Sequence, residues 1–182
     1  MDLPFDLTTG QIVVIALRLL VPLLIPRFPF WGAVAAMLLD GTDVIIVEFF
    51  STGGMGDHYH QLDKILDLYY LGIAFWVSLK WTESLPRRVS IGLFAYRLIG
   101  VALFELFGER WLLFVFPNLF ENWYLFVAGR DEFVPTYRLH TVRRVVIWLV
   151  VLYIPKIAQE YLLHVAEAQP WGWFKDNVLG QD

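Results

Sequence analysis

Apolar residues fill six long stretches of the chain, and short polar, Pro-containing or Gly-rich segments separate them. The stretches run from Thr9 to Ile25, Phe30 to Phe50, His60 to Trp81, Arg88 to Phe107, Trp111 to Ala128 (with a kink expected at Pro117) and Val142 to His164. Each comes near the roughly 20 residues that a helix needs to cross a bilayer. The pattern predicts an all-α fold, a bundle of about six transmembrane helices with residues 1–182 in a single domain.

The composition strengthens this prediction. The 182 residues are 58% hydrophobic and 18% charged, whereas soluble domains are near 45–50% apolar and about 25% charged. The chain has no cysteine, which excludes disulfides, thiolate metal sites and cysteine nucleophiles. Its net charge of -4 gives no support to nucleic-acid binding. We therefore expect an integral, multi-pass protein of the cell's inner or plasma membrane, with membrane lipids, a second copy or the members of a membrane complex as partners.

The ionisable residues assigned to the membrane-embedded part of the predicted spans are mostly acidic. The acids are Asp40, Asp43, Glu48, Asp63, Asp67, Glu105, Glu121 and Glu160, and the bases are Arg18, Lys64, Arg97 and Lys156. A single charge in the middle of a bilayer costs about 2.5–3.5 kcal/mol. The surplus of carboxylates therefore predicts neutralisation by protons, by water or by bound cations.

Two pairs of aspartates flank the Gly-rich segment 51–56. Asp40 and Asp43 are three residues apart and Asp63 and Asp67 are four apart, so each pair lies on one face of its helix. Carboxylates are hard oxygen ligands that suit magnesium or manganese. We expect these four aspartates to be the ligands of a divalent cation. Separate solvation or protonation, or ion pairs with arginine and lysine, is the alternative.

These residues resemble the signature of the CDP-alcohol phosphatidyltransferases, Asp-x2-Asp-Gly-x2-Ala-Arg-x8–9-Gly-x3-Asp-x3-Asp. The similar segments are 40–43 (Asp-Gly-Thr-Asp) and 62–67 (Leu-Asp-Lys-Ile-Leu-Asp), and segment 17–22 (Leu-Arg-Leu-Leu-Val-Pro) is similar to the first helix of that family. The resemblance implies that Asp40, Asp43, Asp63 and Asp67 bind metal and that Asp67 is the general base.

Together, the charges and the resemblance predict a divergent, metal-dependent membrane transferase that acts on a lipid or a phosphorylated alcohol. Arg18, Arg97 and Lys156 are the candidates for binding the phosphate of the substrate. The alternative is a non-enzymatic membrane protein, either a cation or proton transporter or a structural subunit of a membrane complex. Val44 stands where the signature has glycine, which favours this alternative.

Three other groups of polar residues stay open. Segment 57–60 (Asp-His-Tyr-His) is a weak metal-binding pattern or a solvated loop. Lys156, Glu160 and His164 recur every four residues, as in a polar stripe that holds an ion pair or a proton relay. The basic group around Arg143 is a positive anchor or a lipid-headgroup site.

Overall fold

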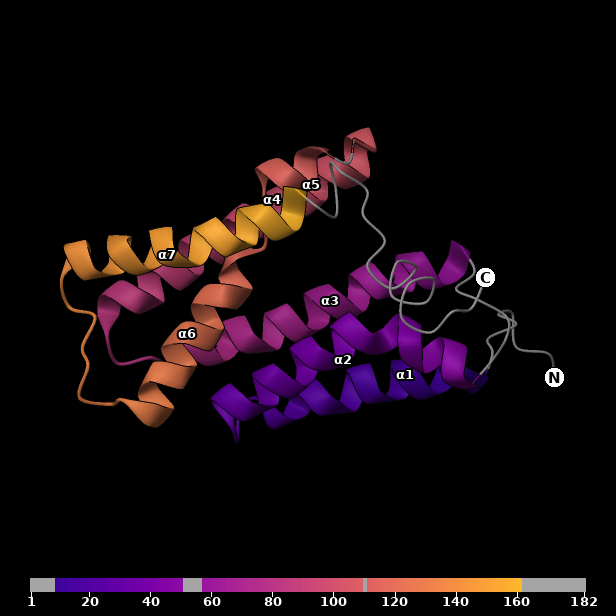
Figure 1. Ribbon diagram of the computed structural model, residues 1–182, viewed down its shortest axis with the longest axis horizontal. Coiled ribbons are helices and arrows are strands. Elements are labelled where there is room, and N and C mark those ends of the chain that lie inside the picture. Colours follow the sequence, from indigo (N-terminus) through magenta and orange to yellow (C-terminus); the bar gives the residue numbers. More distant parts are fainter. Residues whose placement is uncertain (1–8, 51–56, 110, 162–182) are drawn as a thin grey trace, which may run out of the picture. The chain divides into compact units, whose positions relative to one another are not determined.

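The computed structural model describes residues 9–50, 57–109 and 111–161. Within these ranges the regular secondary structure is helical (Figure 1). The elements are α1 (Thr9–Leu20), the 3₁₀ helix η1 (Val21–Leu24), α2 (Pro29–Phe50), α3 (Asp57–Ser78), α4 (Ser84–Phe107), α5 (Trp111–Val115), α6 (Leu119–Phe133) and α7 (Val142–Glu160). The chain divides into two compact units, one made of residues 1–82 and 124–138 and the other of residues 83–123 and 139–182.

The first unit contains α1, η1, α2 and α3, which lie side by side (Figure 1), together with most of α6. Pro22 lies at the start of η1, because proline fits the first turn of a helix but not its interior. The chain then turns back sharply into α2. Gly32 makes this turn possible, since a Cβ there would lie 2.7 Å from the backbone nitrogen of Ile25.

Small and aliphatic side chains bury the contact between these helices. The fully or nearly buried residues are Val14, Ile25, Ala33, Ala36, Leu66, Tyr70, Leu71 and Ala74, joined by Tyr124, Val127 and Ala128 of α6. The alanines of α2 let its neighbours approach closely. Three helices therefore pack tightly enough to exclude water from a charged group on their facing surfaces.

The second unit contains α4, α5, the first residues of α6, and α7. Helix α4 ends at Gly108, whose φ of 71° is in the left-handed region that glycine adopts without strain. Gly100 of α4 lies directly against the side chain of Phe116, where a Cβ would collide. Trp123, which is completely buried, donates a hydrogen bond from its indole nitrogen to the carbonyl oxygen of Pro86 at 3.2 Å.

The single helix predicted for residues 111–128 is wrong. Two helices, α5 and α6, take its place, because Pro117 stops the helix instead of kinking it. The carbonyl oxygen of Pro117 accepts a hydrogen bond from the amide of Leu119 at 2.8 Å, in a tight turn. Helix α6 then continues to Phe133, through residues expected to form a polar loop.

The predicted bundle of six transmembrane helices is also wrong, and so is the multi-pass membrane localisation. In the described residues, only α4 has both the length and the apolar composition of a membrane-spanning helix, and most of it is exposed. Prolines end α1 early and divide the fifth stretch into two helices. Charged residues make α3 and α7 less apolar, although both helices are continuous. Long apolar runs in the sequence thus overestimated the number of spans.

Candidate functional site

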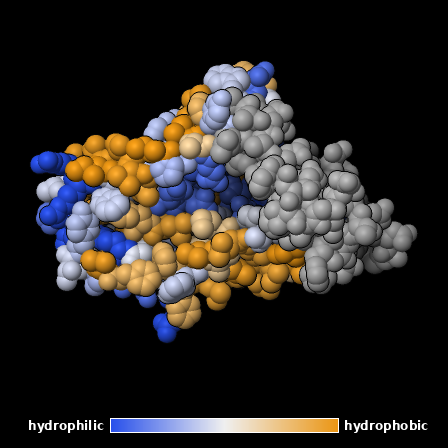
Figure 2. Space-filling view, viewed as in Figure 1, coloured by the Kyte–Doolittle hydropathy of each residue, from blue (hydrophilic) through white to orange (hydrophobic). Residues whose placement is uncertain are grey.

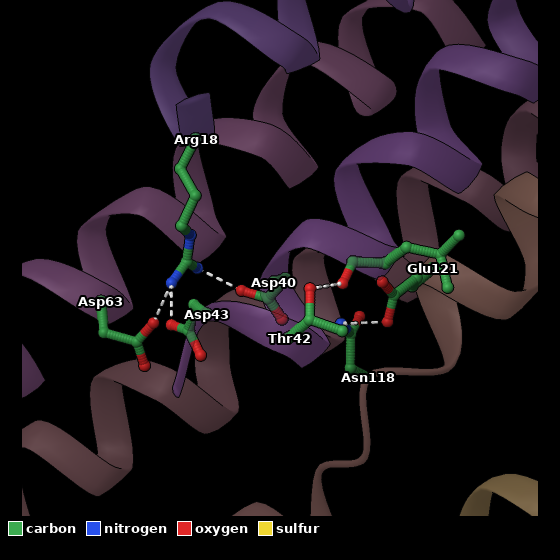
Figure 3. A network of polar contacts seen from close by, with 8 residues as sticks. Arg18, Asp40, Thr42, Asp43, Asp63, Asn118 and Glu121 are labelled. Atoms are coloured by element: carbon green, nitrogen blue, oxygen red, sulfur yellow. Dashed lines mark hydrogen bonds and ion pairs between the residues drawn. The ribbon is translucent and has the colours of Figure 1, made fainter. Parts of the chain in front are cut away.

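A buried arginine joins the three long helices of the first unit. Arg18 of α1 is only 4% exposed, and its guanidinium contacts the carboxylates of Asp40, Asp43 and Asp63 (Figure 3). The ion pair with Asp43 measures 2.8 Å between Nη1 and Oδ2. Asp40 is bound through Nη2 and Asp63 through Nη1. We call these four residues the Arg18 cluster.

Helical spacing places the acids of the cluster. Asp40 and Asp43 lie on one face of α2, because residues three apart project in similar directions, and α3 brings Asp63 to the same point. Thr42, between the two acids of α2, donates its hydroxyl to the carbonyl oxygen of Leu38 at 2.7 Å. That contact turns the hydroxyl of Thr42 toward its own helix. Asp40 and Asp43, on either side of it in the sequence, reach Arg18.

The cluster has a surplus of negative charge relative to its arginine. Burial by itself lowers the pKa of Arg18, but the carboxylates of Asp40, Asp63 and Asp43 outweigh it, and the net pKa lies above its ordinary value. Arg18 therefore keeps its charge at any ordinary pH. Three carboxylates share the charge of this one guanidinium.

The cluster borders a small pocket. Arg18 and Asp40 form its polar side, and the other lining residues are Pro22, Ala36, Leu39, Leu66 and Tyr70. The pocket is small, because the space that the centre of a water molecule can occupy in it is about 10 Å³. The side chain of Asp40 is 36% exposed, whereas that of Asp43 is 9% exposed. Asp40 is thus the carboxylate that a ligand in the pocket would reach first.

Three of the four predicted metal ligands, Asp40, Asp43 and Asp63, meet around Arg18, but they do not have the arrangement of a metal site. No group of three or more His, Asp or Glu side chains in the described part of the chain is arranged to hold a metal ion. The guanidinium of Arg18 lies between the carboxylates instead. The donor chemistry nevertheless suits magnesium or manganese, since Arg18 contacts one oxygen of each carboxylate and a carboxylate accepts at both oxygens.

The remaining predicted site residues lie outside the cluster's described contacts. Asp67, the predicted general base, lies one helical turn after Asp63 on α3 and is half-buried. Arg97 and Lys156, predicted to bind phosphate, belong to α4 and α7 of the second unit. Lys156 is buried and donates to Oε1 of Gln159 at 3.3 Å.

Two of the open polar groups fall on side chains outside the described residues. These are the histidines of segment 57–60, where only the backbone is described, and Glu160 and His164 of the stripe with Lys156. Both groups stay predictions. Near the break at Pro117, Asn118 donates to Oε2 of Glu121 at 3.2 Å, so these two polar residues pair locally (Figure 3).

The ion pairs of Arg18 with the aspartates are the alternative stated above for these acids, and the structure contains them. Sequence reasoning missed the pocket beside them. The pocket residues Ala36, Leu66 and Tyr70 were not considered. Their spacing was a usable signal, because Ala36 precedes Asp40 by one turn and Leu66 follows Asp63 by three residues.

Comparison of the chain with protein-family models, with curated proteins and with solved structures finds no match. The resemblance to the CDP-alcohol phosphatidyltransferases therefore rests on the quoted segments alone. Function has to be argued from the Arg18 cluster and its pocket.

Proposed function

We propose that this protein is a divergent, metal-dependent transferase that acts on a phosphorylated alcohol or a lipid, similar to the CDP-alcohol phosphatidyltransferases. One observation carries the proposal: the carboxylates of Asp40 and Asp43, which have the Asp-x2-Asp spacing of the signature, meet that of Asp63 from a second helix beside a pocket. A cation at this point requires the carboxylates to share their oxygens with Arg18 or to release it.

The protein's residues have defined roles in this reaction. Asp40, Asp43 and Asp63 would hold a magnesium or manganese ion, which would neutralise charge on the phosphates of the donor. Asp67 accepts the proton of the acceptor hydroxyl, the oxygen of that hydroxyl forms a bond to phosphorus, and the bond from phosphorus to the leaving phosphate breaks. Arg18 holds Asp40 and Asp63 in position.

A divalent-cation titration of thermal stability tests this proposal. A ligand at 100 times its Kd stabilises the folded state by about 2.7 kcal/mol, so manganese or magnesium should raise the Tm in a saturable manner. The variants Asp40→Asn and Asp63→Asn should lose this response. A CDP-linked alcohol should stabilise the metal-loaded protein further.

The matched control is Asp131→Asn. Asp131 is 48% exposed and pairs with Arg130 at 2.7 Å in the same unit, so the substitution changes charge equally without touching the Arg18 cluster. Its metal response should equal that of the wild type. An equal Tm rise in Asp63→Asn, or no rise in the wild type, would contradict the transferase.

A second candidate is a non-enzymatic role, in which the cluster only fastens helices together. The observation that favours it is that Arg18 contacts all three carboxylates itself, as a structural ion-pair network does. This role predicts indifference to divalent cations, together with a strong dependence of folding on Arg18. The titration therefore separates the two candidates.

A further inference from the structure

The second unit exposes a group of arginines at one end. Arg87 and Arg88 lie near the start of α4, and Arg143 and Arg144 lie in the first turn of α7. All four side chains are exposed. Figure 2 shows hydrophilic residues near the start of α7. We call these four residues the arginine end.

A hydrogen bond brings the two helix starts together. The backbone amide of Leu139 donates to Oε2 of Glu83 at 2.6 Å. Glu83 directly precedes α4, and Leu139 precedes α7 by three residues. The three non-helical residues from Leu139 to α7 span at most about 11 Å, and a helix rises 1.5 Å per residue. The Cα atoms of the four arginines therefore lie within roughly 15 Å of this contact, at the same end of the second unit.

The packing of each helix turns its arginines outward. Pro86 and Ser90 of α4 and Val145 of α7 are buried. Residues adjacent in sequence on a helix point in different directions, so Arg87 and Arg144, next to these buried positions, project away from the core. The arginine end is thus a fixed feature of a packed pair of helices.

The local electrostatics disfavour this grouping in the isolated chain. Neither α4 nor α7 has an acidic residue in its first turn, and neither has a side-chain cap. The N-terminal end of a helix carries partial positive charge, so cations placed there are repelled. Glu83 supplies one carboxylate, and its Oε2 accepts the amide of Leu139. The potential at this end is therefore positive and suits an anion.

We propose that the arginine end is a binding site for phosphate groups. All four positions are arginine rather than lysine, and the planar guanidinium matches two phosphate oxygens at once, whereas lysine acts as a point charge. The phosphate is either a free one or a lipid headgroup, which present the same oxygens to the guanidinium. The site uses no residue of the Arg18 cluster, so it does not depend on the proposed transferase activity.

Two arms of one experiment test the site and identify its source of phosphate. The first arm titrates the full chain with inorganic pyrophosphate at constant ionic strength by calorimetry. The second arm measures cosedimentation with phosphatidylcholine vesicles that do or do not contain phosphatidylglycerol. Binding in the first arm alone indicates a free phosphate, and binding in the second indicates a lipid headgroup.

The double variant Arg88→Gln, Arg143→Gln should weaken the binding roughly 25-fold, at about fivefold per arginine. The matched control is Arg27→Gln, Lys64→Gln, which removes the same charge from two exposed positions of the first unit, both far in the chain from Glu83. It should bind within about twofold of the wild type. Equal losses in both double variants, or no binding in either arm, would overturn the proposal. Circular dichroism checks that each variant is folded.

Discussion

The two units use arginine differently. In the first unit, Arg18 is buried at the point where α1, α2 and α3 meet, and three carboxylates surround it. In the second unit, Arg87 and Arg143 lie exposed at helix starts, and the buried contacts are mainly apolar and aromatic. Phe94 packs edge to face on Phe120 there, with ring centroids 5.2 Å apart.

The difference shows what allows a charge to be buried. Desolvation of an unpaired ion costs several kcal/mol, and only opposite charges with good hydrogen bonds offset it. The acids of α2 and α3 reach Arg18 because their spacing keeps them on the faces that pack against α1. The first turns of α4 and α7 contain no such acids.

The largest effect is expected for Arg18→Leu, which breaks the centre of the first unit. The variant leaves Asp43 buried beside two other carboxylates without their shared cation, and loss of one side of a buried ion pair costs about 3–5 kcal/mol. Arg87→Leu, at an exposed position of the second unit, should change stability by at most about 0.5 kcal/mol. Urea denaturation of both variants measures the contrast.

Arg18→Lys refines this comparison. Lysine keeps the charge but lacks the planar fork that reaches several carboxylates, so it should restore only part of the lost stability. If Arg18→Leu and Arg87→Leu cost the same free energy of unfolding, the Arg18 cluster is not what holds the first unit together.

A smaller effect is expected from the apolar packing of the second unit. In Gly100→Ala the new Cβ would lie 2.9 Å from Cγ of Phe116 and closer still to its Cβ, so the variant should lose about 1–3 kcal/mol. Gly92→Ala in the same helix meets nothing within 4 Å. It should gain about 0.5–1 kcal/mol, because alanine favours the helix.

The same denaturation assay measures both glycine variants. A loss at Gly92 equal to that at Gly100 would show that α4 does not pack against Phe116 as closely as described. A loss confined to Gly100 would show that close contact, rather than charge, stabilises the second unit.

Local sequence signals predicted the bounds of α2 and α3 better than they predicted the break at Pro117 or the number of membrane spans. The stretches predicted from Phe30 to Phe50 and from His60 to Trp81 nearly coincide with α2 and α3, because proline and glycine mark helix ends locally. The break at Pro117 was not predicted, since a proline kinks or ends a helix according to the contacts of the flanking turns. Apolar composition, similarly, does not by itself distinguish a span from a helix packed in another way.

The site was predictable to the extent that it depends on spacing along one helix. The pairing of Asp40 with Asp43 on one face follows from the 3.6-residue period, and both reach Arg18. The identity of their partner does not follow from it, because the cation comes from α1, more than 20 residues away in sequence. Only the packing of α1 against α2 decides that Arg18 faces the acids.

The smallest effect compares one tyrosine in each unit at alkaline pH. Burial raises the pKa of Tyr124 in the first unit well above its ordinary value of about 10. The stability that this group contributes is fully present below pH 10 and declines as pH rises from there toward the folded-state pKa. At pH 11 the loss is about 1 kcal/mol, at 1.36 kcal/mol per pH unit. Tyr124→Phe should therefore lose less stability between pH 8 and pH 11 than the wild type. In the second unit, burial and the neighbouring Tyr153 also raise the pKa of Tyr96, which is 38% exposed and donates its hydroxyl to the carbonyl oxygen of Val115 at 2.6 Å. Tyr96→Phe should therefore lower stability at pH 8 and lower it less at pH 11. An unchanged alkaline loss in Tyr124→Phe would mean that Tyr124 is not desolvated by the first unit.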